Sequence, residues 1–169
     1  MQSTISGKAF VYGANVDTDQ IYPGRFLDLT DVEDVAKHAM KGIDPDFASA
    51  LEPGDIIVAA TNFGCGSSRE HAVVTLKHAG VGAVLAESFG RIFYRNGINL
   101  GLPLLICPGV APKVKRGDRL QVDLNASMVH NATTGESYPL EPVSEYARHI
   151  LDAGGIKPLL RAEMARTET

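Results

Sequence analysis

The chain has 169 residues, a length that suits one domain with a substantial core and is short for two. Hydrophobic residues make up 44% and charged residues 21%, which excludes extended disorder. The net charge of −4 argues against nucleic acid as a partner, because the chain has no excess of positive charge for a phosphate backbone.

The sequence also argues against a membrane-spanning or secreted protein. No stretch approaches the roughly 18–20 unbroken apolar residues of a membrane span. The first residues lack the charged and apolar regions of a signal peptide, and two cysteines provide no disulfide framework. We therefore expect a cytoplasmic protein with reduced thiols.

The first third of the chain predicts one strand followed by short helical segments. Residues 8–13 (KAFVYG) read as a strand that ends in a glycine turn. Residues 30–40 have the apolar spacing of one helix face. Thr30 is the expected N-cap of this helix, with Glu33 three residues later completing a capping box.

The middle of the chain alternates apolar strand patterns with helical ones. In chain order these are a buried strand at 56–59, a helix from about Ser67 to Gly80, a strand at 81–88, a short helix at 90–99 and a strand at 102–109. Strands and helices that alternate at this spacing indicate βαβ units and a largely parallel sheet.

After residue 115 the pattern becomes antiparallel. Residues 118–125 alternate as a half-exposed strand, residues 128–140 read as a hairpin around Thr134 and Gly135, and residues 142–155 form a last amphipathic helix. We expect one α/β domain over residues 1–160, of β/β/α type with mostly parallel βαβ units and a C-terminal hairpin and helix. Residues 161–169 are expected to be a solvated C-terminal tail.

The segment TNFGCGSSREHAVV (61–74) concentrates reactive side chains between a strand and a helix. Gly64 and Gly66 let the backbone take positive φ and approach a ligand closely. Ser67, Ser68 and Arg69 are expected at the helix start, where free N–H groups and the dipole favour a bound anion. Stabilised by the same donors, a serine alkoxide could serve there as an acid or base.

Other interpretations of this turn are open on local grounds. Ser67 could be only an N-cap, with Glu70 completing a capping box. A phosphate-binding loop is disfavoured because its lysine is missing, and the dinucleotide fingerprint lacks its third glycine. Cys65 could be a thiol nucleophile with His71 as its base. Two cysteines cannot supply the four thiolates of an iron–sulfur cluster, so another chain would have to hold one.

Two further polar segments are candidates for the site. Asp17, Thr18 and Asp19 form an acidic turn that is either a helix cap or a source of a carboxylate that orients water or a serine. Arg91 and Arg95 lie four residues apart on one expected helix face, where each is either an anion ligand or a surface charge.

Three long segments together resemble the small subunits of 3-isopropylmalate dehydratase, the detached swivel domain of the aconitase superfamily. They are DTDQIYPGRFL (17–27), NFGCGSSREHA (62–72) and ESFGRIFYRNGINLGLPLL (87–105). The resemblance implies a heteromeric hydro-lyase whose large subunit holds a [4Fe–4S] cluster, with no metal in this chain. It also implies a small branched dicarboxylate substrate.

The resemblance also assigns roles to residues. It implies that Ser67 removes the proton next to a substrate carboxylate, and that Ser68 and Arg69 bind carboxylate. Asp19 matches an acidic residue placed beside the active site. The implied reaction is dehydration to an unsaturated diacid, followed by rehydration on the neighbouring carbon.

Substrate choice in this family follows the segment at Phe26, Leu27, Asp28 and Leu29, where relatives often carry an arginine. Asp28 would repel a substrate carboxylate, which disfavours a homoaconitase, whereas the leucines suit an alkyl group. The resemblance thus favours 3-isopropylmalate, with a 2,3-dimethylmalate-type dehydratase as the competitor. A stand-alone anion-binding module is the non-enzymatic alternative.

Overall fold

The structure, a computed structural model, describes residues 3–167. Its strands are β1 (Thr4–Val11), β2 (Ile56–Ala59), β3 (Ala83–Ala86), β4 (Leu104–Ile106), β5 (Arg119–Asp123), β6 (Met128–Asn131) and β7 (Ser137–Pro139). Its helices are α1 (Thr18–Ile21), α2 (Val32–Ala36), α3 (Phe47–Ala50), α4 (Glu70–Ala79), α5 (Arg91–Asn99), α6 (Glu145–Ala153) and α7 (Ile156–Thr167). Two 3-10 turns lie at Gly24–Phe26 and Ala111–Lys113.

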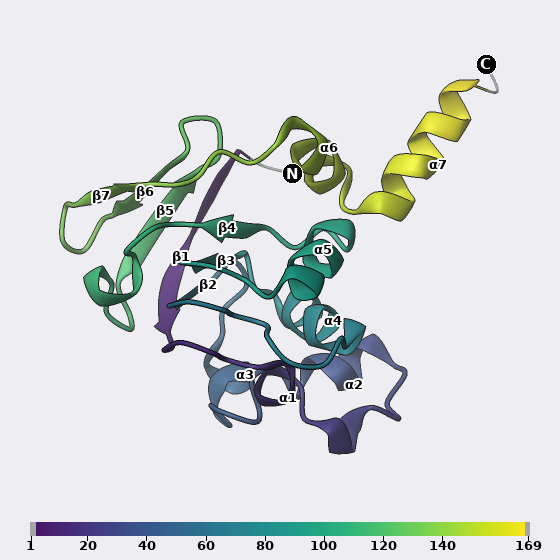
Figure 1. The fold of residues 1–169 in the computed structure, drawn as a ribbon, viewed down its shortest axis with the longest axis horizontal. Coiled ribbons are helices and arrows are strands. Elements are labelled where there is room, and N and C mark those ends of the chain that lie inside the picture. The colour runs from purple at the N-terminus through teal and green to yellow at the C-terminus, as the bar shows by residue number, and fades with distance from the viewer. Residues whose placement is uncertain (1–2, 168–169) are drawn as a thin grey trace.

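The strands form one seven-stranded sheet in the order β4-β3-β2-β1-β5-β6-β7. Strands β1 to β4 are parallel, and β5 to β7 add to β1 as antiparallel neighbours. The helices lie against one side of β1–β4, and β5–β7 lie on the other (Figure 1). The expected α/β fold with parallel βαβ units and a C-terminal hairpin is confirmed.

Strands β2 and β3 are buried on both faces because they are enclosed by two hydrophobic clusters. Ile57 and Val84 belong to the cluster beneath the helices, while Ile56 and Leu85 belong to the cluster beneath β5–β7. Strands covered on both faces read as continuous apolar runs, as IIVA and AVLA do here. Packing on both faces therefore fixes the positions of the parallel strands and of their carboxyl ends, from which the loops of the site begin.

Several element boundaries differ from those expected. Strand β1 begins at Thr4 because its first half pairs with β5. Helix α2 is capped by Asp31, not Thr30, since the Asp31 carboxylate accepts a hydrogen bond from the Glu33 amide. The C-terminal stop of α4 at Gly80, with φ 107°, agrees with expectation.

The C-terminal segment extends beyond the last expected helix. Helix α7 continues to Thr167 and points away from the body of the molecule (Figure 1). Residues 161–167 are exposed and helical, while residues 168 and 169 lie outside the described residues. Within residues 3–167, no helix combines the length and apolar character needed to cross a membrane.

Candidate functional site

The loops that follow β1, β2 and β3 meet at the carboxyl edge of the parallel strands. Two isolated parallel bridges join them, one between Asp17 and Cys65 and one between Phe63 and Phe89. The Gly64 amide donates to the Val16 carbonyl at 2.7 Å, and the Gly90 amide donates to the Phe63 carbonyl at 2.8 Å. In open α/β sheets ligands bind at this edge, so the three loops define the candidate site.

Glycines allow these loops to approach one another closely. Gly64 has φ 82°, and a Cβ there would lie 2.2 Å from Cγ of Phe93. A Cβ at Gly90 would lie 2.7 Å from the Gly64 carbonyl oxygen. Gly66 has φ 94° and turns the chain toward Ser67. The sequence predicts glycine at 64 for close approach to a ligand. The structure adds a second reason, because Gly64 packs against Phe93 of α5 and leaves no room for a Cβ.

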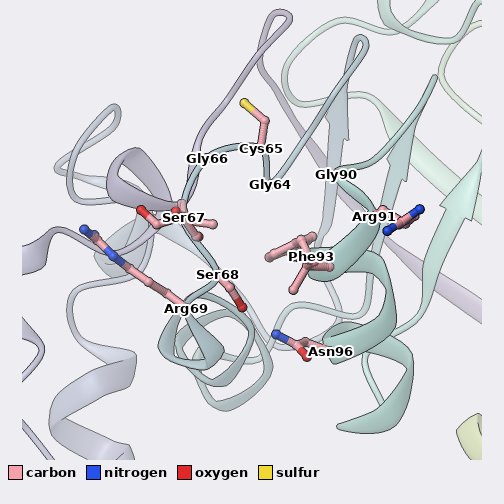
Figure 2. A pocket seen from close by; sticks show the side chains of 12 residues that line it. Gly64, Cys65, Gly66, Ser67, Ser68, Arg69, Gly90, Arg91, Phe93 and Asn96 are labelled. Atoms are coloured by element: carbon pink, nitrogen blue, oxygen red, sulfur yellow. The ribbon is translucent and has the colours of Figure 1, made fainter.

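The loop that follows β2, residues 60–69, is here named the central loop. A cavity of about 280 Å³ lies between this loop and α5 (Figure 2). Its lining residues are Thr18, Gly64, Cys65, Gly66, Ser67, Ser68, Arg69, Gly90, Arg91, Ile92, Phe93 and Asn96. Gly90 is the N-cap of α5, and among the described residues no side-chain cap hydrogen bond is made at this helix start. The open end of a helix therefore borders the same cavity as the two serines and Arg69, and free first-turn amides favour an anion there.

The helix after the central loop starts later than expected, at Glu70, with Arg69 as an N-cap that makes no side-chain cap hydrogen bond. Ser67 is thus not an N-cap, and the predicted capping box with Glu70 is wrong. The reason is a long-range contact, because the Thr18 hydroxyl donates to the Ser67 carbonyl at 2.8 Å and holds this peptide outside the helix. Ser67 and Ser68 are exposed, and no described residue forms a hydrogen bond with either hydroxyl oxygen.

Arg69 is held in place by the acidic turn. Its Nη1 lies 2.8 Å from Oδ1 of Asp19 and donates to the Tyr22 carbonyl at 3.3 Å. Oδ1 of Asp19 also accepts a hydrogen bond from the Gly24 amide at 2.9 Å. Arg69 and then the Gly24 amide hold the pKa of Asp19 below its usual range. Among the described residues none bonds to Nε or Nη2 of Arg69, so those groups face no internal acceptor.

Asp17 has a local role. Its carboxylate accepts from the Gln20 amide at 2.8 Å, and the Gln20 side chain accepts from the Asp17 amide, forming a capping box at α1. The cap interpretation is therefore confirmed for Asp17. Asp19, by contrast, is directed to Arg69 and lies outside the lining of the cavity.

The segment expected to choose the substrate also lies outside the cavity lining. Phe26 stacks on His38 with ring centroids 3.7 Å apart, and Leu29 packs against the core. Leu27 and Asp28 are exposed. Gly24, two residues before this segment, lies next to Arg69 and Asp19. The structure thus brings Ser67, Ser68 and Arg69 together and leaves the 26–29 segment beside them.

The two thiols occupy different environments. Cys65 lies at the cavity, with its sulfur directed away from Ser67 and Ser68 (Figure 2), and no hydrogen bond joins it to His71. Cys107 is buried in the cluster under β5–β7, and burial raises its pKa to about 11. Within residues 3–167, no group of three or more His, Cys, Asp or Glu side chains is arranged to hold a metal ion.

Arg91 and Arg95 of α5 are both exposed, but only Arg91 borders the cavity that contains the serines. Arg91 borders the cavity, but its side chain points away from the serines (Figure 2). Arg95 lies on a separate hollow between α5 and α6, which Arg91 also borders.

The sequence did not indicate Asn96 or the first-turn amides of α5 as parts of the site. Thr18 was noticed only as part of an acidic turn. The contacts that place these residues join segments about 25 to 50 positions apart, such as the hydrogen bond between Thr18 and Ser67. The signal that could have found the α5 terminus is its position directly after a predicted parallel strand.

Comparison with known proteins gives a consistent result over nearly the whole chain. The Aconitase C-terminal domain family matches residues 16–107. The chain is 51% identical over 168 residues to the isopropylmalate/citramalate isomerase small subunit of Methanocaldococcus jannaschii, covering 99% of this chain and 100% of that protein. It is 47% identical over 156 residues to the 2,3-dimethylmalate dehydratase small subunit of Eubacterium barkeri, covering 92% and 96%.

A solved structure agrees with these relatives. The crystal structure of 3-isopropylmalate dehydratase from the same Methanocaldococcus species superposes with a TM-score of 0.94 at 41% identity, covering 98% of both chains. The fold and the sequence identity therefore agree. The chain belongs to the aconitase C-terminal domain family, among the small subunits of 3-isopropylmalate dehydratase and its related hydro-lyases.

Proposed function

We propose that this chain works with a large subunit to interconvert 2-isopropylmalate and 3-isopropylmalate by dehydration and rehydration, as a cytoplasmic enzyme of leucine biosynthesis. The observation that carries the proposal is the cavity lined by Ser67, Ser68 and Arg69 on one side and by the start of α5 on the other. High identity to small subunits named for isopropylmalate and 2,3-dimethylmalate supports a branched malate as the substrate.

The cavity has donors for a dicarboxylate. Nε and Nη2 of Arg69 form the planar fork that suits one carboxylate, because its ion pair with Asp19 uses Nη1. The Ser68 hydroxyl and the first-turn amides of α5 are the donors for the rest of the anion. Asp19 then has the task of orienting the guanidinium, since its carboxylate is already bonded to Arg69 and Gly24.

Ser67 is the proposed base. Its Oγ would take the proton from the carbon next to a substrate carboxylate and return it during rehydration. No carboxylate or imidazole among the described residues is bonded to this hydroxyl, so its activation has to come from donors that stabilise the alkoxide. Ser67 is exposed in the single chain, and a docked partner that excludes water would strengthen these electrostatic interactions.

The residues of this chain do not fit a resident iron–sulfur cluster. Cys65 lies at the cavity and Cys107 lies in the buried core beneath β5–β7. We therefore assign the [4Fe–4S] cluster to the partner large subunit. When bound there, such a cluster supplies a Lewis-acidic iron for the departing hydroxyl group.

The test is reconstitution with a large subunit of the 3-isopropylmalate dehydratase family, assayed anaerobically by the absorbance of the unsaturated diacid. We expect Ser67→Ala to lower kcat by about 10²–10⁴-fold, the usual contribution of a positioned proton-transfer group. Ser137→Ala on β7, an exposed serine remote from the cavity, is the matched control and should keep full activity. Full activity in the Ser67→Ala complex would contradict the role of this serine.

The same complex tests the substrate. Leu27 is exposed three residues after Gly24, which lies next to Arg69, and its side chain would accommodate an alkyl group of the substrate. Asp28 disfavours a third carboxylate. We expect kcat/KM to be higher for 3-isopropylmalate than for 2,3-dimethylmalate, and lowest for homoaconitate. Tight dicarboxylate binding by the chain alone, in titration calorimetry, combined with an inactive complex would support the stand-alone anion-binding module instead.

A further inference from the structure

Tyr22 connects the two parts of the site that the fold leaves separate. Its side chain is fully buried, and each of its polar groups contacts a different segment. The backbone carbonyl accepts from Nη1 of Arg69 at 3.3 Å. The phenol hydroxyl donates to the Phe26 carbonyl at 2.6 Å. One residue thus bonds to the arginine of the central loop and to the segment that follows Gly24.

The ring of Tyr22 makes a third connection. It stacks on His71 with centroids 5.4 Å apart and an interplanar angle of 16°. His71 is the second residue of α4, directly after the Ser67–Arg69 turn. The ring is therefore packed against the helix that carries the turn, while its hydroxyl reaches the other segment.

The segment that Tyr22 holds is otherwise fixed by side-chain packing and short-range hydrogen bonds. Its amides at Phe26, Leu27 and Leu29 donate to carbonyls within residues 23–26, in short local turns. Phe26 stacks on His38, and the Arg25 guanidinium lies 4.6 Å from the Phe26 ring centroid. Surface turns held by local hydrogen bonds open easily, so the Tyr22 hydroxyl adds a restraint to the link that runs from the Gly24 amide through Asp19 to Arg69.

We infer that Tyr22 is a positioning residue that holds the Arg69 guanidinium and the Gly24–Leu29 segment at a set distance from each other. In the proposed function, on which this inference rests, Arg69 binds a carboxylate and the Gly24–Leu29 segment faces the alkyl group. Tyr22 then fixes the spacing at which a branched malate is recognised. It does not touch the reacting atoms.

The direct test is amide hydrogen exchange on the full chain with Tyr22→Phe, which removes the hydroxyl and keeps the ring on His71. We expect the amides of Phe26, Leu27 and Leu29 to exchange about fivefold faster, the effect of losing one hydrogen bond of typical net strength. Tyr138→Phe is the matched control, because Tyr138 is also a buried phenol with a backbone acceptor but lies on β7. It should leave exchange at 26–29 unchanged.

Two outcomes would overturn the inference. One is unchanged exchange at these three amides in Tyr22→Phe. The other is an equal increase at the amides of β6, which would show general loosening of the fold instead of a local release.

Kinetics of the reconstituted complex provide the second measurement. We expect Tyr22→Phe to raise KM for 3-isopropylmalate about fivefold with kcat within about twofold of the wild type, as for a lost positioning contact in the ground state. A fall in kcat at unchanged KM would contradict it. If the wild-type complex has no hydro-lyase activity, the proposed function fails while the exchange result still decides whether Tyr22 holds the segment.

Discussion

Replacement of Gly64 by alanine tests whether the central loop is fixed by its contact with α5. The added Cβ would lie 2.2–2.7 Å from three carbons of Phe93. Phe93 has little freedom to move, because it is buried and packs edge-on against Phe63 at 5.5 Å. Such overpacking costs about 1–3 kcal/mol, and alanine at positive φ costs about 1–2 kcal/mol more.

Gly135 separates these two contributions. It has φ 80°, nearly the value of 82° at Gly64, but an added Cβ there meets nothing within 4 Å. We therefore expect Gly135→Ala to lower the free energy of unfolding by about 1–2 kcal/mol through backbone strain alone. Gly64→Ala should lower it by about 2–5 kcal/mol, the sum of strain and overpacking.

Urea denaturation followed by circular dichroism is the assay. With an m-value of about 2 kcal/mol/M, the midpoint of Gly64→Ala should lie roughly 1 M below that of Gly135→Ala. Equal midpoints for the two variants would refute the reasoning, since they would show that Phe93 yields to the methyl group at no cost.

Two further predictions concern ionisable groups at the site and in the core. Because Arg69 and the Gly24 amide lower the pKa of Asp19, the ion pair should be present above the ordinary Asp pKa and be lost as pH falls through the lowered value. Carboxyl NMR titration should give an Asp19 midpoint below 3.8 that moves upward in Arg69→Gln, and an unmoved midpoint would contradict the pairing. Because burial raises the pKa of Cys107 to about 11, iodoacetamide at about pH 8 should alkylate Cys65 alone in the native chain. Two adducts by mass spectrometry of the native protein, with one remaining in Cys65→Ser, would show that Cys107 is reactive.

Much of the fold was predictable because the decisive signals are local. The apolar runs at 56–59 and 83–86, the hairpin glycine Gly135 and the helix stop at Gly80 each depend on neighbouring residues. Which face β5–β7 would cover was not predictable, since it depends on the pairing of β1 with β5 across more than 100 residues. The correct cap at Asp31 was missed because Thr30 beside it has equivalent capping chemistry.

The sequence was sufficient to predict which residues form the candidate site, but not how the fold arranges them. The resemblance identified Ser67, Ser68 and Arg69, and the structure places all three at one cavity. The start of α4 was misplaced because the Thr18 hydroxyl, 49 positions away, bonds to the Ser67 carbonyl and holds this peptide outside the helix. Tyr22 gave no signal, since its three contacts become visible only when the chain is folded.

The bridges that join the loops after β1, β2 and β3 have a thermodynamic consequence for assembly. Backbone pairing continues beyond the ends of the named strands, so the site loops are a stiff extension of the sheet. Ordering a free loop on association costs conformational entropy, and this chain has already met that cost during folding. The bridged parts of these loops should therefore keep their positions when the chain associates with the large subunit, as in rigid-body docking.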